Sequence, residues 1–176
     1  MKIAIIGPPG SGKTTLAAGL FYQLKKMNKK VELVPELIKL KVYKGEDFSR
    51  AGFDIGNTLQ QQDFETAFSY NQFDYLILEA PLCNGYFYSS FYGKSTESLV
   101  LKQIAEENIN NYDVILFHRL LPEVDYSEFG RKESKETSIK LESWIDQKFN
   151  ELGFKGSVIK TDINTNLTDL ISNLKK

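Results

Sequence analysis

Short runs of four or five apolar residues recur along the chain, and longer amphipathic or polar stretches separate them. Runs of this length are typical of strands that are buried on both faces of a parallel sheet. We interpret five of them as strands, of which the last is the weakest: 2–6, 31–34, 75–78, 114–117 and 157–160. Short apolar strands that alternate with helices predict an α/β fold built around a parallel sheet.

The stretches between these strands repeat their apolar residues every three or four positions, which predicts amphipathic helices. Segment 44–57 differs, because three glycines lie among polar residues there, and we expect a loop. The expected helices are 14–27, 36–42, 58–70, 97–109, 138–152 and 167–174. The later apolar residues that we expect to face the core are Phe64, Phe68, Ile139, Trp144, Ile145, Phe149 and Leu152.

Composition places the chain among ordinary globular proteins. It has 176 residues, 41% of them hydrophobic and 26% charged, so we expect one domain over 1–176. The net charge of −1 argues against a broad surface for nucleic acid or anionic membranes. The single Cys83 and single His118 exclude an internal disulfide and a zinc site rich in cysteine or histidine. Without an apolar run of about 20 residues or a signal peptide, a cytoplasmic location is expected.

The most specific motif lies directly after the first strand. Residues 7–14 match the pattern G-x-x-x-x-G-K-[ST] at every fixed position, and a helix is expected to follow. Glycines let successive N–H groups point inward as an anion-binding nest, and the positive end of the helix adds to that field. The motif predicts that Lys13 reaches the β- and γ-phosphates and that the Thr14 hydroxyl binds Mg²⁺. The expected nucleotide-binding residues are Gly7, Pro8, Pro9, Gly10, Ser11, Gly12, Lys13, Thr14 and Thr15.

Charged side chains follow the other strands at the edge where a ligand is expected. Glu36 comes after the second strand, Glu79 after the third and Arg119 after the fourth. Because ligands of parallel sheets bind beyond the carboxyl ends of the strands, we expect these residues to lie close to the P-loop. We expect Glu79 to help hold Mg²⁺ and Glu36 to orient or deprotonate an acceptor.

Arginine is rare in this chain, which makes its placement informative. Arg119 ends the fourth strand, and Arg131 lies in a segment of about 119–134 that we interpret as a lid. An arginine on a lid can stabilise charge on a transferred phosphoryl group when the lid closes. We interpret His118 as a structural histidine rather than a base.

With these motifs the chain resembles the small AAA-type ATPase/kinase family that is common in phage genomes. That family is related to ribosylnicotinamide kinase domains. The resemblance covers about residues 1–165 and rests on the P-loop with its helix, on 31–36, on 74–82 and on the glycine–arginine motif of the lid. Glu79 stands where the family usually has aspartate, so we expect a water-bridged role in metal binding. The resemblance implies a three-layer P-loop kinase fold with five parallel strands in the order 2-3-1-4-5.

The function that these features favour is an ATP- and Mg²⁺-dependent kinase. Its acceptor is expected to be a nucleoside, a nucleotide or a similar small molecule, with Lys13, Glu36, Arg119 and Arg131 as catalytic residues and Thr14 and Glu79 as metal ligands. Two alternatives stay open from the sequence. One is a nucleotide-dependent switch or assembly ATPase without a small acceptor, and the other is a kinase of modified bases in DNA, which the net charge disfavours.

Overall fold

The computed structural model describes residues 1–69, 72–123, 125–127 and 131–174. Strands and helices alternate along most of the chain, as the apolar pattern predicts. The elements are β1 (Lys2–Ile6), α1 (Lys13–Lys26), β2 (Val31–Val34), α2 (Leu37–Tyr43), α3 (Phe53–Ser69), β3 (Tyr75–Leu78), α4 (Cys83–Phe91), α5 (Ser95–Asn108), η1 (Ile109–Asn111, a 3₁₀ turn), β4 (Val114–His118), α6 (Lys135–Asn150), β5 (Ser157–Thr161) and α7 (Leu167–Leu174).

The strands form one parallel sheet in the order β2-β3-β1-β4-β5 within the described residues. This confirms the expected fold class and strand order. β1 lies in the centre, where Ile3 is aligned with Ile77 of β3 and Val114 of β4. Central strands are covered on both faces, which explains why β1, β3 and β4 are apolar along nearly their whole length. The weaker apolar run of β5 fits its place at the edge of the sheet.

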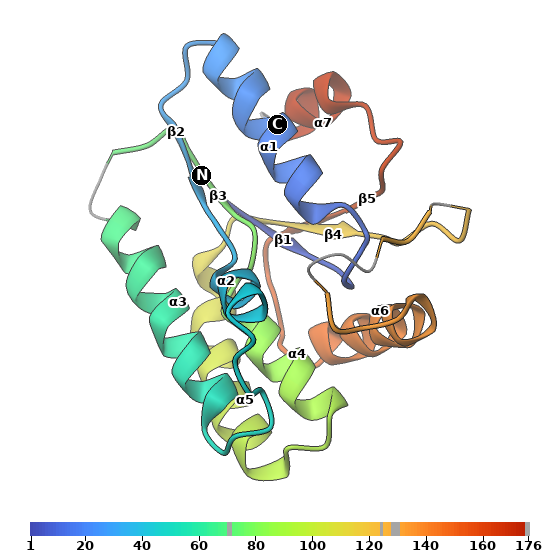
Figure 1. Cartoon of the computed structure of the whole chain (residues 1–176). Helices are drawn as coiled ribbons and strands as arrows, with labels where there is room; N and C mark the ends of the chain where they lie inside the picture. Colours follow the sequence, from blue (N-terminus) through green and yellow to red (C-terminus); the bar gives the residue numbers. More distant parts are fainter. Residues whose placement is uncertain (70–71, 124, 128–130, 175–176) are drawn as a thin grey trace.

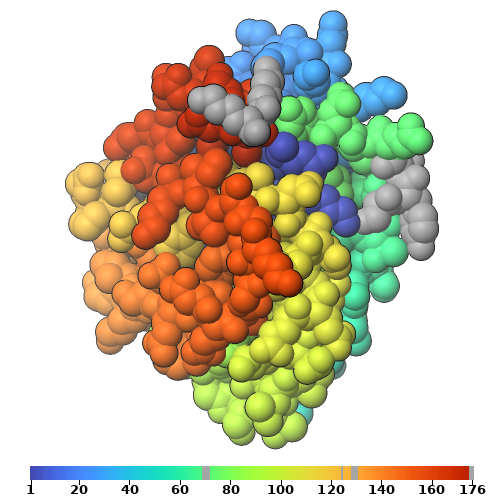
Figure 2. Space-filling model, turned by 180° about the vertical axis from the view of Figure 1, so that it is seen from behind, coloured from blue at the N-terminus to red at the C-terminus, as the bar shows by residue number. Residues whose placement is uncertain are grey.

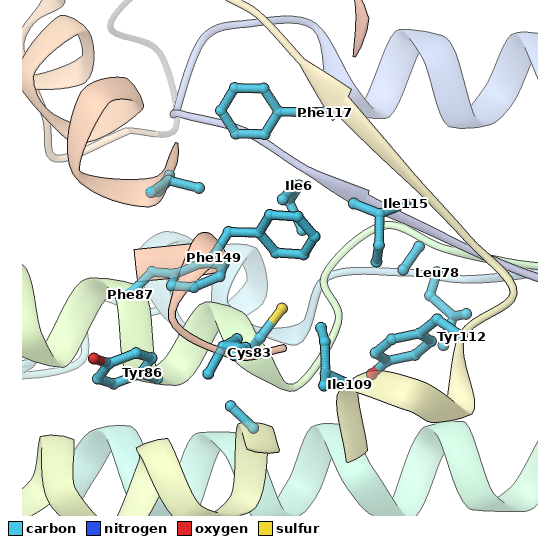
Figure 3. Packing of buried hydrophobic residues seen from close by; sticks show 14 of the residues in the cluster. Ile6, Leu78, Cys83, Tyr86, Phe87, Ile109, Tyr112, Ile115, Phe117 and Phe149 are labelled. Atoms are coloured by element: carbon cyan, nitrogen blue, oxygen red, sulfur yellow. The ribbon is translucent and has the colours of Figure 1, made fainter. Parts of the chain in front are cut away.

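Helices cover both faces of the sheet and enclose two cores (Figure 1). On one face, α1 and α7 pack through Leu16, Leu20 and Leu170 against Ile5 and Leu116 of the sheet. The other face carries the larger core, formed with α4, α5 and α6. Figure 3 shows its aromatic centre, where Phe87 and Phe149 lie near Ile6 and Phe117. In the view from behind, α6 and the C-terminal segment cover one side of the molecule (Figure 2).

Two helices differ from the expectation. The helix expected over 58–70 begins at Phe53, so the first residues of α3 were wrongly assigned to a loop. The reason is a tertiary cap: the carboxylate of Glu97 on α5 accepts hydrogen bonds from the backbone N–H groups of Gly52 and Asp54, at 3.0 and 3.2 Å. Helix α4 was not predicted at all, although Cys83 and Phe87 anchor it in the core.

Some residues expected in the core lie elsewhere. Ile139 is 47% exposed and Phe64 is 43% exposed, so both expectations were wrong. Helix α6 faces the core through Ser138, Leu141, Ile145 and Phe149 instead. Ile139 therefore falls on the outer side of a helix that turns a slightly different face inward. Trp144 is half-buried, and its indole N–H donates to the Ser90 hydroxyl at 3.0 Å.

Parallel strands bring their carboxyl ends to one edge of the sheet. Gly7, Glu36, Glu79 and Arg119 follow directly or within two residues after β1, β2, β3 and β4. All four backbone positions therefore share this edge, as the strand assignment predicts. Among the described residues, the helices are too short or too polar to cross a membrane.

Candidate active site

The P-loop connects β1 to α1 and is bounded by two other segments. Gly7 has φ +149°, and a β-carbon there would lie 2.2 Å from the carbonyl oxygen of His118 at the end of β4. At Gly10, with φ +79°, a β-carbon would lie 2.3 Å from the ring of Tyr126. Only glycine fits such close approaches combined with positive φ. The loop is therefore held between β4 and the segment that precedes α6.

Lys13 turns back onto the loop from the first turn of α1. Its ammonium group donates to the carbonyl oxygens of Gly7 and Pro8, at 2.9 Å each, and the residue is 8% exposed. Burial lowers the pKa of Lys13, while the charges of Glu36 and Glu79 act in the opposite direction. A buried cation held against the P-loop is well placed to attract phosphate oxygens.

A hydroxyl and a carboxylate meet beside the loop. The Thr14 hydroxyl donates a hydrogen bond to Glu79, which is 5% exposed. The backbone N–H of Glu79 donates to the Val34 carbonyl at 3.0 Å, which fixes the carboxylate at the end of β3. Mg²⁺ prefers oxygen ligands and is usually held by one or two protein groups plus phosphates and water. This pair of oxygen donors therefore fits Mg²⁺.

Glu36 is positioned at the start of α2 by Gln61 of α3. The Gln61 amide accepts from the backbone N–H of Leu37 and donates to the carbonyl of Pro35, at 3.2 Å in each bond. Burial raises the pKa of Glu36, Lys13 lowers it and Glu79 raises it again. A carboxyl group with a raised pKa is a better proton acceptor than an ordinary glutamate.

The two arginines lie in different surroundings. Arg131 lines the same cleft as Lys13 and Glu36, and its guanidinium lies over the Tyr126 ring with 5.3 Å to the centroid. Arg119 is not among the cleft-lining residues, and its Nε donates to Glu142 of α6 at 2.9 Å. Of the expected lid, 119–134, residues 124 and 128–130 lie outside the described part of the chain.

Lys13, Thr14, Glu36 and Arg131 line one cleft of about 890 Å³, whereas Glu79 lies behind Thr14 and is not among its lining residues. The P-loop forms one end, and α2, α3, α4 and residues 131–133 form the walls. Several lining residues were not singled out from the sequence, namely Lys39, Asn57, Gln61, Asn84 and Tyr88. Asn84 and Tyr88 belong to α4, so they could not be found without that helix. For Asn57 and Gln61, the helical period of α3 was the available signal.

His118 lies behind the P-loop and is 1% exposed. Its Nδ1 is 3.0 Å from the Thr161 hydroxyl, and burial lowers its pKa to about 4. A β-carbon at Gly12 would lie 3.3 Å from Nε2 of His118, so the ring packs directly against the loop. A histidine that stays neutral at physiological pH and packs in this way fits the structural role that we expected.

A parallel sheet with a glycine-rich loop after its central strand, a buried loop lysine and a threonine–carboxylate pair defines a P-loop α/β protein. Residues 2–165 match the AAA domain family. Because this match covers most of the chain, the protein belongs to that family.

Solved structures with the same fold include a deoxyadenosine kinase and a NadR protein. A deoxyadenosine kinase from M. mycoides, solved with the products dCMP and dCDP, has a TM-score of 0.63, 16% identity, and coverage of 99% of this chain and 98% of that one. A NadR protein in complex with NR has a TM-score of 0.71 and 16% identity. That match covers 98% of this chain, which spans about half of the NadR chain, 49%. No curated protein matches the sequence.

Proposed function

We propose that the chain is an ATP- and Mg²⁺-dependent phosphotransferase that acts on a nucleoside, a nucleotide or a similar small acceptor. The observation that carries this proposal is one cleft lined by both the P-loop lysine and the carboxylate of Glu36, which acts electrostatically on that lysine. Its volume of about 890 Å³ lies at the upper end of typical small-molecule sites. The donor phosphates belong at the loop, so the space along α2, α3 and α4 is available to a second ligand.

Each residue of the site has a role that suits phosphoryl transfer. Lys13 and the loop N–H groups would bind the β- and γ-phosphates, and Thr14 with Glu79 would hold Mg²⁺. A Mg²⁺ ion held by these two residues would supply positive charge against the negative charge that develops on the phosphates. Glu36 would orient the acceptor hydroxyl and take up its proton, and Arg131 would stabilise negative charge on the transferred group.

A catalytic role for Arg119 has less support from the structure than from the sequence. Its guanidinium would have to leave Glu142 before it could reach a phosphate in the cleft. The Leu120 N–H donates to the same carboxylate at 2.8 Å, which favours the present arrangement. We therefore base the proposal on Lys13, Glu36, Glu79 and Arg131 and treat Arg119 as secondary.

The similar structures support a nucleoside-like acceptor. One is named as a deoxyadenosine kinase and another was solved with NR. At 16% identity these likenesses concern the fold, and the fold alone hosts several reactions. The acceptor class is therefore supported by two observations together: the ligands of the similar structures, and the space beyond the P-loop in which a second ligand would fit.

The test is transfer of label. The protein is incubated with Mg²⁺, γ-labelled ATP and a pool of nucleosides and nucleotides, and the products are separated. We expect one acceptor class to gain label, and Lys13→Ala to lose the activity by at least about 100-fold. Lys26→Ala, at the exposed far end of α1, is the matched control and keeps it. Release of inorganic phosphate at a rate that no acceptor changes would contradict the proposal and favour an ATPase.

A further inference from the structure

Helices α3 and α4 pack closely against each other at the wall of the cleft to which Thr58 and Gly85 belong. A β-carbon at Gly85 would lie 2.2 Å from the Thr58 hydroxyl oxygen, so the backbone of α4 at this point packs directly against the Thr58 side chain of α3. Asn57 and Asn84 each precede one of these contact residues, on α3 and α4 respectively, and both line the cleft. The crossing therefore places two carboxamides on the same wall.

Both carboxamides contain a buried polar atom without a hydrogen-bond partner. Oδ1 of Asn57 and Nδ2 of Asn84 are shielded from solvent and pair with no described residue. Gln61, one turn further along α3, is different because it bridges Pro35 and Leu37. An unsatisfied buried group costs about 10- to 100-fold in an equilibrium constant. A ligand would recover this cost if its binding turned the two carboxamides toward the cleft and supplied both partners.

The surroundings indicate what kind of ligand fits. Each carboxamide can donate and accept, and half a turn about its terminal bond exchanges the two. The rings of Tyr88, Tyr92 and Phe48 line the same cleft. Lys94, a cation of this wall, is already bonded to Asp54 and to the Phe48 carbonyl, at 2.7 and 2.8 Å. A neutral planar ring with a donor and an acceptor on its edge matches this wall better than an anionic group does.

We propose that Asn57 and Asn84 determine acceptor specificity by binding the hydrogen-bonding edge of a neutral, nucleobase-like ring. This inference rests on the proposed function, because it assigns the second half of the same cleft. With the ring against the wall that α3 and α4 form, the hydroxyl of the acceptor would extend along the cleft toward Glu36 and Lys13. An ionised phosphate at this wall has no proton for the Asn57 carbonyl oxygen, and an aliphatic alcohol offers a single hydroxyl to two carboxamides.

The first test changes the ligand and leaves the protein intact. Calorimetry measures the affinity for adenosine, guanosine, cytidine and uridine, each compared with an analogue whose ring has lost its polar edge. Benzimidazole riboside serves for the purines and phenyl C-riboside for the smaller rings. We expect at least one nucleoside to bind about tenfold or more tightly than its analogue. Equal affinities within every pair, or no binding of any nucleoside, would overturn the inference.

The second test changes the protein with substitutions of nearly equal volume. Asn57→Leu and Asn84→Leu are each expected to raise KM for the preferred nucleoside about 10- to 100-fold, while kcat and the affinity for Mg²⁺-ATP change less than about threefold. Neither variant is expected to weaken binding of the analogue without a polar edge. Asn173→Leu, on the exposed side of α7, is the matched control.

The outcomes separate this inference from the proposed function. Label transfer that both leucine variants retain with unchanged KM would overturn the specificity assignment and leave the kinase proposal intact. Nucleoside binding that depends on the two carboxamides, without any label transfer, would overturn the kinase proposal and support the specificity assignment. If a leucine variant does not fold, the comparison of ligands on the unmodified protein decides by itself.

Discussion

The pKa of the Glu36 carboxyl group depends on its charged neighbours in the site. Burial raises its pKa, the ammonium of Lys13 lowers it, and the carboxylate of Glu79 raises it. With a raised pKa, Glu36 takes up a proton on acidification before an ordinary glutamate does. A reaction that uses the ionised carboxylate is then lost at a correspondingly higher pH.

This gives a prediction for the pH dependence of transfer. In the unmodified protein, the acid limb of kcat/KM is expected to lie above pH 4.5, the ordinary value for glutamate. Glu36→Gln is expected to lower kcat at least about 100-fold and to remove this limb, while Mg²⁺-ATP still binds. Rate profiles against pH and calorimetry check both parts. Glu32→Gln on β2 is the control, and an acid limb that survives in Glu36→Gln would contradict the role.

A second residue-scale prediction concerns the oxygen pair formed by Thr14 and Glu79. Glu79→Gln keeps the volume and one acceptor oxygen but removes the charge that would attract a cation. We expect the Mg²⁺ concentration for half-maximal activity to rise about 10- to 100-fold. Binding of ATP in the absence of Mg²⁺ is expected to change little, and calorimetry with a chelator measures it. An unchanged Mg²⁺ requirement would show that Glu79 does not act on the metal.

At the scale of elements, the sheet could be predicted because its signal is local. The runs 3–6, 75–78 and 114–117 are apolar throughout, so their burial is evident without any knowledge of the fold. Together with run 31–34, these strands are parallel, so their carboxyl ends place the P-loop, Glu36 and Glu79 on one edge of the sheet. The assignment of the phosphate end of the site needed nothing more.

The far wall of the cleft could not be predicted, because its helices depend on tertiary contacts. The start of α3 is capped by Glu97, which is more than 40 residues away in sequence. Residues 83–91 contain glycine, asparagine and serine, which are poor helix formers. Packing of Cys83 and Phe87 against the core stabilises α4 in spite of this composition. Asn84 and Tyr88 reach the cleft only because α4 forms.

The close packing of α3 and α4 can be tested by substituting two glycines, of which one substitution is expected to destabilise the fold and the other to stabilise it. Gly85→Ala would place its β-carbon 2.2 Å from the Thr58 hydroxyl and is expected to destabilise the fold by about 1–3 kcal/mol. Gly56→Ala, inside α3 with open space around it, is expected to stabilise by about 0.5–1 kcal/mol. Urea unfolding measures both. The double variant Thr58→Ala with Gly85→Ala is expected to recover part of the loss, and equal effects of the two glycine substitutions would contradict the close crossing.

Arg131 belongs to the segment that approaches the P-loop before α6. Its guanidinium lies over Tyr126, whose ring in turn lies against Gly10. Arg131→Ala is expected to lower kcat about 100-fold or more, with less than about a threefold change in the affinity for Mg²⁺-ATP. Lys140→Ala, on the exposed side of α6, is the control. Weaker nucleotide binding at unchanged kcat would exclude a role in the transfer step.

At the scale of the whole molecule, one buried polar network joins elements that are far apart in sequence. The Tyr112 hydroxyl donates to the Glu65 carboxylate, with 3.1 Å to Oε2, and accepts from the Leu82 N–H at 3.1 Å. Glu65 belongs to α3, Tyr112 precedes β4, and Leu82 precedes α4. Burial raises the pKa of Glu65 to about 7, and the hydrogen bond from Tyr112 acts against this rise. The network therefore links the protonation of the Glu65 carboxyl group to the stability of the fold.

The direction of this effect follows from proton linkage. The ordinary glutamate value of 4.5 represents the unfolded chain, so between pH 4.5 and about 7 the folded state binds more protons than the unfolded state. Stability contributed by protonated Glu65 is complete below pH 4.5 and is lost as the pH rises through about 7. At about 1.4 kcal/mol for each tenfold change in proton affinity, this loss amounts to about 3 kcal/mol.

Glu65→Gln is therefore expected to make the protein more stable at high pH. Glutamine is neutral throughout and can still accept from Tyr112, so the variant and the unmodified protein are expected to unfold alike at pH 5. At pH 8 the variant is expected to be more stable by up to about 3 kcal/mol. Urea unfolding at pH 5, 6, 7 and 8 measures the difference, with the exposed Glu106→Gln of α5 as the control. A constant difference between the two proteins across this range would mean that Glu65 is ionised in the fold, because only a buried carboxyl that is protonated near neutral pH gives a difference that grows with pH.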